Sequence, residues 1–272
     1  METPVIFETH AHYDDEAFAQ DRENLLASMQ EHGIGYIVNA CASIESLKDT
    51  EELMEQYPFV YGAFGIHPDD AEKMTEETLE EIRQLSRLPK AVAIGEIGLD
   101  YYWHKEEHEH EIQKKMFLAQ MEIAREEKLP FMVHSRDAAK DTFDLIAARG
   151  KGQRGVIHCY SYSPEMAQEY VKLGYHIGLG GVVTFKNAKK AKETARQIPL
   201  ERILLETDCP YMAPTPFRGK RNNSAYIDYV AQEIADLKGI SKEEVIAVTE
   251  ENAKKLFAII SVENTPTSAS GE

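Results

Sequence analysis

Cysteine pairs, long apolar runs and an excess of positive charge are all missing from this 272-residue chain. Its three cysteines, Cys41, Cys159 and Cys209, form no C-x-x-C pair, which excludes a disulfide scaffold and a thiolate zinc cluster and suits a reducing compartment. No apolar run approaches the ~18 residues of a membrane helix, and the start has no basic leader, so we expect no membrane partner and a cytoplasmic location. Thirty Lys and Arg against 47 Asp and Glu give a net charge of −17, which excludes a non-specific coat on nucleic acid.

Short apolar runs alternate with longer amphipathic stretches along most of the chain. The eight apolar runs are 5–9, 36–40, 60–64, 91–94, 130–133, 155–157, 175–179 and 203–205. The stretches predicted as helices are 16–32, 44–56, 75–88, 107–127, 137–149, 163–173, 188–197 and 241–260.

This alternation predicts parallel strands joined by right-handed helical crossovers. Either a closed eight-stranded TIM barrel, regular or distorted, or a doubly wound open sheet satisfies it. The missing G-x-G-x-x-G and Walker loops disfavour the open nucleotide-binding sheet. No composition break marks a second domain, so we expect one α/β domain over residues 1–260. The small, polar tail over 261–272 is predicted to be disordered.

Residue types that bind metals follow the apolar runs. They lie at the predicted carboxyl ends of the strands, which share one face of a parallel barrel, where active sites are built. The candidates are His10, His12, His67, Glu96, His134, His158 and Asp208. Imidazole and carboxylate ligands without thiolate suit Zn, Mg or Mn.

Strand alternation sharpens this prediction. Residues two apart on a strand project to the same side, so His10 and His12 can hold one cation together, with Glu8 one layer deeper. Glu206 and Asp208 are paired in the same way. By contrast, His104 and His108 lie in a fully charged stretch and are predicted to belong to a solvated helix start.

One dense basic cluster interrupts the acidic sequence. Arg218, Lys220 and Arg221 follow the last predicted strand and should border the same barrel mouth. Guanidinium and ammonium groups beside a cationic site favour phosphate binding over a plain solvated loop. Arg136, two residues after His134, is a candidate for a second phosphate clamp.

Eight motifs appear in order from about Phe7 to Phe257: T-H-x-H, G-I-H-P, G-E-I-G-L-D-Y, V-H-S-R, I-H-C-Y, L-E-T-D-x-P, R-G-K-R-N and E-N-A-K-K-L-F. Together they resemble the TatD family of metal-dependent deoxyribonucleases among the amidohydrolase-like TIM barrels. The resemblance implies hydrolysis of DNA phosphodiesters, often from a 3′ end. Two departures are Glu8, where the family commonly has Asp, and Asn223-Ser224, where Pro often follows the basic segment.

The resemblance also implies a ligand set for two divalent ions. His10, His12, Glu96 and Asp208 surround one ion, and Glu96, His134 and His158 surround the other, with Glu96 bridging. Glu96 and Asp208 are then the catalytic residues. His67, Arg136, Tyr160, Arg218, Lys220 and Arg221 are the candidate contacts to substrate, which we expect to be a DNA end or single strand. We expect the protein to act as a monomer.

Two alternatives stay open from the residues. The first is a hydrolase on the same scaffold that cuts an amide or another small ester. A Lys-bridged version is disfavoured because strand four leads to Glu96 and Lys90 precedes it. The second is a non-catalytic metal-binding barrel, whose mark would be a missing ligand.

Overall fold

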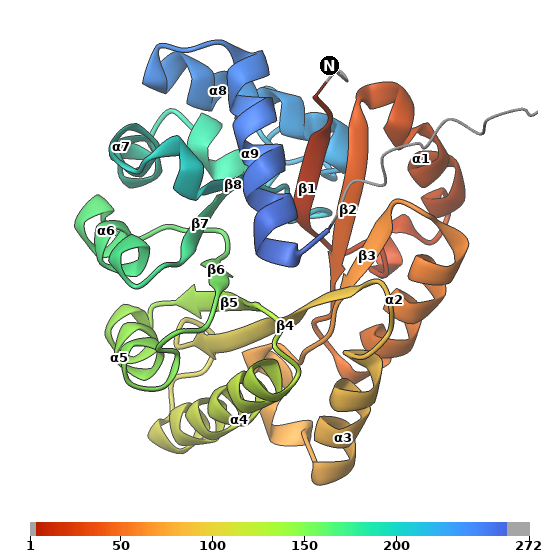
Figure 1. The fold of residues 1–272 in the computed structure, drawn as a ribbon, viewed down its shortest axis with the longest axis vertical. Helices are drawn as coiled ribbons and strands as arrows, with labels where there is room; N and C mark the ends of the chain where they lie inside the picture. Colours follow the sequence, from red (N-terminus) through yellow and green to blue (C-terminus); the bar gives the residue numbers. More distant parts are fainter. Residues whose placement is uncertain (1–3, 260–272) are drawn as a thin grey trace, which may run out of the picture.

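The computed structural model describes residues 4–259, in which eight parallel strands pair in chain order around a barrel (Figure 1). The strands are β1 (Ile6–Ala11), β2 (Ile34–Ala40), β3 (Val60–Ala63), β4 (Ala91–Asp100), β5 (Phe131–Arg136), β6 (Gly155–Ile157), β7 (His176–Leu179) and β8 (Ile203–Leu205). All eight predicted strands are confirmed, and the closed barrel replaces the open-sheet alternative.

The barrel closes just beyond β8. A parallel bridge joins Ala11 to Cys209, the His12 N–H donates to the Cys209 carbonyl, and the Asp208 N–H donates to the His10 carbonyl. Closure therefore occurs at the carboxyl end of β1, among the predicted ligands.

Helices follow the strands and cover the outside of the barrel. They are α1 (Arg22–Ser28), α2 (Ile44–Gln56), α3 (Glu76–Leu85), α4 (Glu107–Glu126), α5 (Ala139–Arg149), α6 (Pro164–Lys172), α7 (Lys189–Gln197), α8 (Ile227–Lys238) and α9 (Lys242–Phe257). The helix predicted over 16–32 is interrupted: two short 3₁₀ turns flank α1.

Helix α8 is absent from the sequence prediction. Its buried residues Ile227, Val230, Ala231, Ile234 and Ala235 repeat at the spacing of a helix face, so the signal was present. The predicted tail over 261–272 lies outside the described residues. Between residues 4 and 259, no helix is both long and apolar enough to cross a membrane.

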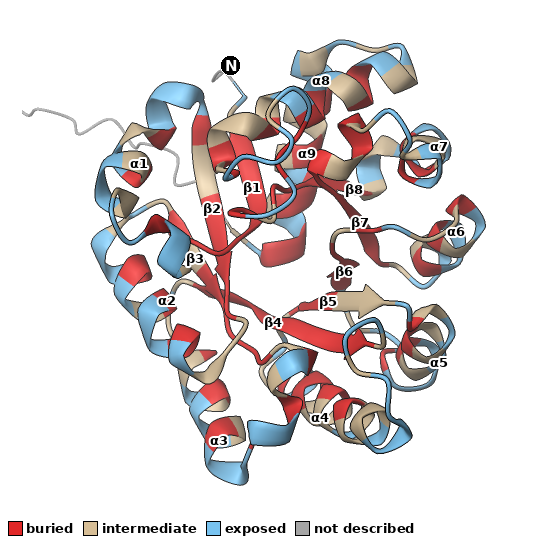
Figure 2. Ribbon diagram, turned by 180° about the vertical axis from the view of Figure 1, so that it is seen from behind, coloured by how far each residue is buried: buried red, intermediate tan, exposed pale blue. Residues whose placement is uncertain are grey.

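The two ends of the barrel are filled differently. One apolar cluster takes side chains from β1 to β6 and from β8 and joins them to Ala253, Leu256 and Phe257 of α9. The Phe257 ring stacks on Phe7 near the start of β1, at 5.8 Å between centroids. Helix α9 therefore plugs the amino-terminal end of the barrel (Figures 1 and 2), whose strands are almost wholly buried.

Candidate active site

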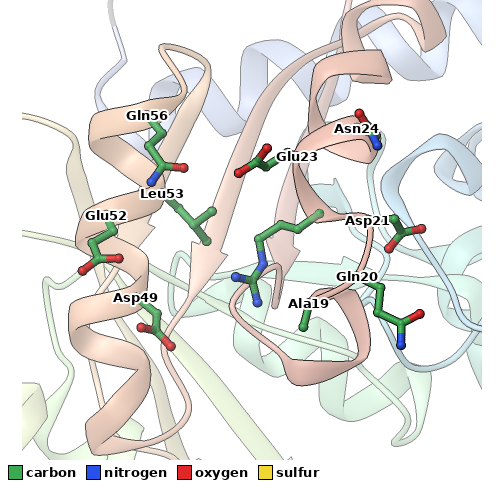
Figure 3. Close-up of a pocket in the computed structure, with 10 residues that line it drawn as sticks. Ala19, Gln20, Asp21, Glu23, Asn24, Asp49, Glu52, Leu53 and Gln56 are labelled. Carbon is green, nitrogen blue, oxygen red and sulfur yellow. The ribbon is translucent and has the colours of Figure 1, made fainter.

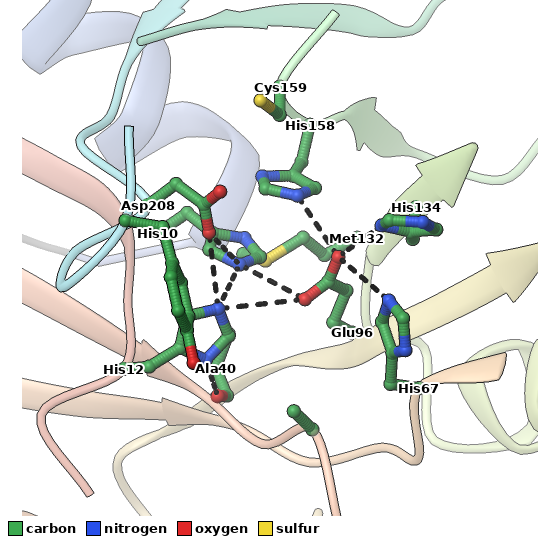
Figure 4. Close-up of polar contacts among 12 residues, drawn as sticks. His10, His12, Ala40, His67, Glu96, Met132, His134, His158, Cys159 and Asp208 are labelled. Atoms are coloured by element: carbon green, nitrogen blue, oxygen red, sulfur yellow. Dashed lines mark hydrogen bonds and ion pairs between the residues drawn. The ribbon is translucent and has the colours of Figure 1, made fainter. Parts of the chain in front are cut away.

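At the carboxyl end of the strands, the six residues predicted as metal ligands converge (Figure 4). His10 and His12 come from β1 and the residue after it, Glu96 from β4 and His134 from β5. His158 directly follows β6, and Asp208 comes three residues after β8. All except His10 line a cavity of about 1270 Å³ that opens at the barrel mouth. Residues almost two hundred positions apart are thus brought together.

Glu96 lies at the centre of this group, and its two carboxylate oxygens face different partners. Oε1 lies 2.9 Å from His134 Nδ1 and 3.0 Å from His158 Nε2. Oε2 lies 3.3 Å from His10 Nε2 and 3.7 Å from His12 Nε2. A carboxylate shared in this way has the arrangement of a ligand that bridges two cations.

Asp208 completes the second of these groups. Its Oδ1 lies 3.3 Å from His12 Nε2 and 3.8 Å from His10 Nε2. Its backbone has φ of 59°, a left-handed conformation that non-glycine residues adopt rarely and often at functional sites. This conformation ends the strand pattern and turns the carboxylate toward the two histidines.

Neighbouring groups fix the orientation of the imidazoles. His12 Nδ1 donates to the Ala40 carbonyl at 2.8 Å, so its Nε2 lone pair faces the site. His134 Nε2 lies 3.2 Å from Asp100 Oδ2, and His158 Nδ1 lies 3.4 Å from Glu206 Oε1. Such carboxylate–histidine pairs are typical of metal sites, where they set the tautomer and raise ligand basicity.

Glu8 forms a supporting layer beneath the site. Its Oε1 accepts hydrogen bonds from the backbone N–H groups of His10 and Thr207, and its Oε2 accepts one from the Thr207 hydroxyl. Burial raises the pKa of Glu8 to about 8 against the effect of these bonds. Glu8 therefore ties β1 to the segment after β8 and holds the ligands in place.

Burial opposes charge on every group in the site, and the neighbouring charges decide the result. For Glu96, burial is outweighed by the charges of His158 and His10, which hold its pKa well below the usual range. For His134, burial is outweighed by hydrogen bonds to Asp100 and Glu96, which raise its pKa to about 9. The carboxylates of Glu96 and Asp208, whose pKa values are both lowered, therefore stay ionised and favour positive charge beside them.

The donor set fits divalent ions. His10 Nε2 and His12 Nε2 lie 3.1 Å apart, while His12 carries its proton on Nδ1 and His10 Nδ1 faces Met132 Sδ. The two Nε2 atoms therefore point at one space, where a cation would be held by the lone pairs of the neutral rings. Between residues 4 and 259, every group of three or more close potential ligands belongs to this mouth.

The family model of the TatD-related DNases matches residues 7–258. The chain belongs to this family. It is 43% identical over 256 residues to the uncharacterized metal-dependent hydrolase YabD of Bacillus subtilis, with 94% of this chain and 100% of that protein covered. It is 33% identical to the uncharacterized metal-dependent hydrolase YcfH of Escherichia coli, over 93% of this chain and 96% of YcfH.

A solved structure of a TatD homologue also matches this chain. The TatD homologue YjjV of Escherichia coli superposes with a TM-score of 0.87 at 30% identity, over 94% of this chain and 98% of YjjV. The phosphotriesterase homology protein of Escherichia coli, solved with phosphate in its active site, matches with a TM-score of 0.66 at 14% identity, over 94% of this chain and all of that one. The second likeness shows the barrel fold alone. The family and its relatives make this chain a metal-dependent hydrolase.

The predicted substrate contacts of this TatD-family chain separate into two groups. His67, Arg136, Arg218 and Lys220 line the cavity. His67 Nδ1 accepts from the Asp69 N–H at 3.2 Å, and its Nε2 lies 3.9 Å from Glu96 Oε1. Because Asp69 holds Nδ1, Nε2 is the nitrogen that faces the ligand group.

The basic side chains differ in their ion pairs. Within residues 4–259, no carboxylate lies within 4.0 Å of the charged groups of Arg136, Arg218 or Lys220. Arg221 instead forms a two-pronged pair with Asp21, at 2.7 and 2.6 Å, and lies outside the cavity lining. Arg136, Arg218 and Lys220 therefore keep their charge available to an anion, whereas Arg221 anchors the basic loop.

Tyr160 is placed away from the cavity. Its side chain belongs to the apolar core, only 3% of the residue is exposed, and its hydroxyl donates to the Ser163 carbonyl. The structure thus does not bring Tyr160 to a substrate, because the chain turns sharply at Cys159, where φ is 44°.

Two residues at the mouth escaped the sequence prediction. Asp100 lies at the end of β4, which continues beyond Glu96 past a register shift. Trp103 follows it and lines the cavity. The motif G-E-I-G-L-D-Y contained the signal for Asp100, but the predicted strand ended at residue 94.

A second, smaller hollow lies between the start of α1 and α2 (Figure 3). It has a volume of about 400 Å³ and is lined by Asp21, Glu23, Asp49 and Glu52 around Arg22. Arg22 Nη2 donates to the carbonyls of Asp14 and Asp15. With no imidazole in its lining, this hollow offers a poor set of metal ligands.

Proposed function

We propose that this TatD-family hydrolase cleaves phosphodiester bonds of DNA, at ends or in single strands and from the 3′ side, with two divalent ions of Zn, Mg or Mn. The shared Glu96 carboxylate carries the proposal, because its two oxygens face two separate sets of nitrogen ligands. Bound divalent ions would supply Lewis acidity and lower the pKa of water.

The protein groups around this centre have distinct proposed roles. Asp208, whose carboxylate stays ionised at neutral pH because His12 and the neighbouring imidazoles outweigh its burial, would accept the proton of the attacking water. His67 Nε2 would donate to a nonbridging phosphate oxygen. Arg136, Arg218 and Lys220 would bind the neighbouring phosphates, since their charges are unpaired within the described chain.

The shape of the site supports an end or single strand as substrate. The proposed ligands lie at the carboxyl end of the barrel strands, and His10, Glu96 and His158 are almost fully buried there, so a flexible end or single strand reaches them more readily than a continuous duplex does. An acidic chain with a net charge of −17 also lacks a broad basic surface for duplex wrapping. The monomeric state and cytoplasmic location stay predictions.

The decisive experiment is digestion of end-labelled single-stranded DNA by protein freed of metal and reloaded with Mg, Mn or Zn. We expect 3′-to-5′ shortening only with added ion, and none from the Glu96→Gln variant. Activity on a panel of small amides and esters, with none on DNA, would favour the alternative hydrolase. Bound metal with no turnover on any of these substrates would favour a non-catalytic barrel.

A further inference from the structure

The rim of the cavity carries an exposed indole ring that the proposed chemistry leaves unused. Trp103 is 65% exposed, lies three residues after the end of β4 and lines the cavity together with Arg136. It is the single tryptophan of the chain. Solvent contact of a large aromatic ring at a binding site is unfavourable unless a ligand covers it.

The ring belongs to a group of aromatic and cationic side chains. Tyr102 and Trp103 meet edge to face with centroids 4.7 Å apart. The Arg136 guanidinium stacks over Tyr102 at 3.9 Å and lies 5.6 Å from the centre of the Trp103 ring. Lys105 also lies 5.2 Å from the Tyr102 centroid, so the faces of Tyr102 have cationic neighbours, while Trp103 presents more of its surface to solvent.

A single buried carboxylate fixes this group relative to the metal ligands. Asp100 Oδ1 accepts hydrogen bonds from the backbone N–H groups of Tyr102 and Trp103, at 2.8 and 3.0 Å. Its other oxygen lies 3.2 Å from His134 Nε2. The indole is therefore positioned by the same residue that orients a proposed ligand.

We propose that Trp103 is a stacking platform for a nucleobase of single-stranded DNA, next to the phosphate that Arg136 binds. This inference rests on the proposed function. A nucleotide presents a flat base and a charged phosphate side by side, which matches an indole beside an unpaired guanidinium. Bases in a duplex are already stacked on their neighbours, so the platform selects unpaired ends.

Because Trp103 is the chain's single tryptophan, its fluorescence reports the platform without any need for turnover. The Glu96→Gln variant is titrated, with Mg²⁺ present, with a dye-free oligothymidylate and with an abasic strand of equal phosphate number. Anisotropy of dye-labelled copies measures binding independently. We expect saturable quenching by oligothymidylate and none by the abasic strand.

Kinetic measurements on variants that retain Glu96 complete the test. Trp103→Ala should raise KM for single-stranded DNA roughly 5- to 150-fold, the range for loss of one base–aromatic stack, with kcat little changed. Trp103→Phe should restore most of the loss. Leu173→Ala, which truncates an exposed apolar side chain outside the cavity lining, is the control and should leave KM unchanged.

The outcomes separate the two proposals. Binding and hydrolysis of DNA without quenching, and with KM unchanged in Trp103→Ala, would overturn the platform while the nuclease function stands. Absence of both DNA binding and DNA hydrolysis in the metal-loaded wild-type protein would overturn both.

Discussion

Two histidines at opposite ends of this barrel, His134 and His176, have opposite electrostatic surroundings. At the mouth, hydrogen bonds to Asp100 and Glu96 overcome burial and raise the pKa of His134 to about 9. At the plugged end, burial and the charge of Arg202 lower the pKa of His176, the first residue of β7, to about 4. Carboxylates therefore raise the pKa of His134, whereas burial lowers the pKa of His10, the most enclosed of the proposed ligands, as it does that of His176.

The other side chains at the two ends of the barrel also differ in charge. The mouth gathers charged groups whose desolvation is unfavourable, whereas α9 and the strand starts bury apolar rings and methyl groups. Substitutions at the mouth should therefore affect turnover most, whereas substitutions at the plugged end should affect stability alone.

The largest expected effect is at Glu96. Glu96→Gln should lower turnover roughly 10³-fold or more, because the amide removes the negative charge shared between the two ligand groups. In metal-free protein at neutral pH, the variant should stay folded but with a lower Tm than wild type, because the depressed pKa of Glu96 means that its charge stabilises the fold and because the amide leaves the neighbouring imidazoles without their carboxylate. Wild-type turnover in the metal-loaded variant would contradict the role of the shared carboxylate.

At the opposite end, Phe257→Ala should reduce the free energy of unfolding by about 3 kcal/mol or more, because it leaves a cavity beneath the α9 plug. Its kcat and KM, measured below the lowered Tm, should match wild type. Urea titration measures the free energy of unfolding, and initial rates measure kcat and KM. A change in KM with unchanged stability would show that this end also shapes the substrate site.

His176 should make the plugged end sensitive to acid. Its folded pKa of about 4 lies below the unfolded value of 6.5, so the unfolded chain takes up the extra proton and stability is lost as pH falls from 6.5 to 4. The loss should reach as much as roughly 3 kcal/mol. The difference in unfolding free energy between His176→Gln and wild type, followed against pH, should shift in favour of the variant over this window. A pH-independent difference would refute the depressed pKa.

The smallest expected effect compares two arginines near the mouth. Arg136→Ala should raise KM for single-stranded DNA about tenfold, through loss of one charge-assisted contact. Arg221→Ala should change KM less than twofold, because Asp21 already holds that guanidinium. Equal effects of the two substitutions would show that the whole basic loop, rather than its unpaired members, binds substrate.

Much of the fold was predictable because parallel, doubly buried strands leave a plain pattern. All eight apolar runs became strands, and α2 has the predicted bounds. Periodicity did not locate the break in the 16–32 stretch, where local 3₁₀ turns intervene. Helix α8 was missed although its buried apolar residues repeat at the spacing of a helix face.

The proposed metal ligands were predictable because they lie at or just beyond the carboxyl ends of strands that must meet. The substrate contacts around these ligands could not be predicted in the same way. Strand alternation holds only while the backbone stays extended, and left-handed residues at Cys159 and Asp208 break it. Whether a cation such as Arg221 is already paired depends on Asp21, two hundred residues away, which no local pattern reveals.

The closure of the barrel also determines when the site can form during synthesis of the chain. Asp208 N–H donates to His10 C=O, so the first and last ligands along the polypeptide are fastened by one backbone bond. During synthesis, the histidines near the start must wait for residue 208 to leave the ribosome before the centre exists. A nascent or truncated chain that lacks residue 208 therefore cannot assemble the complete group of proposed ligands.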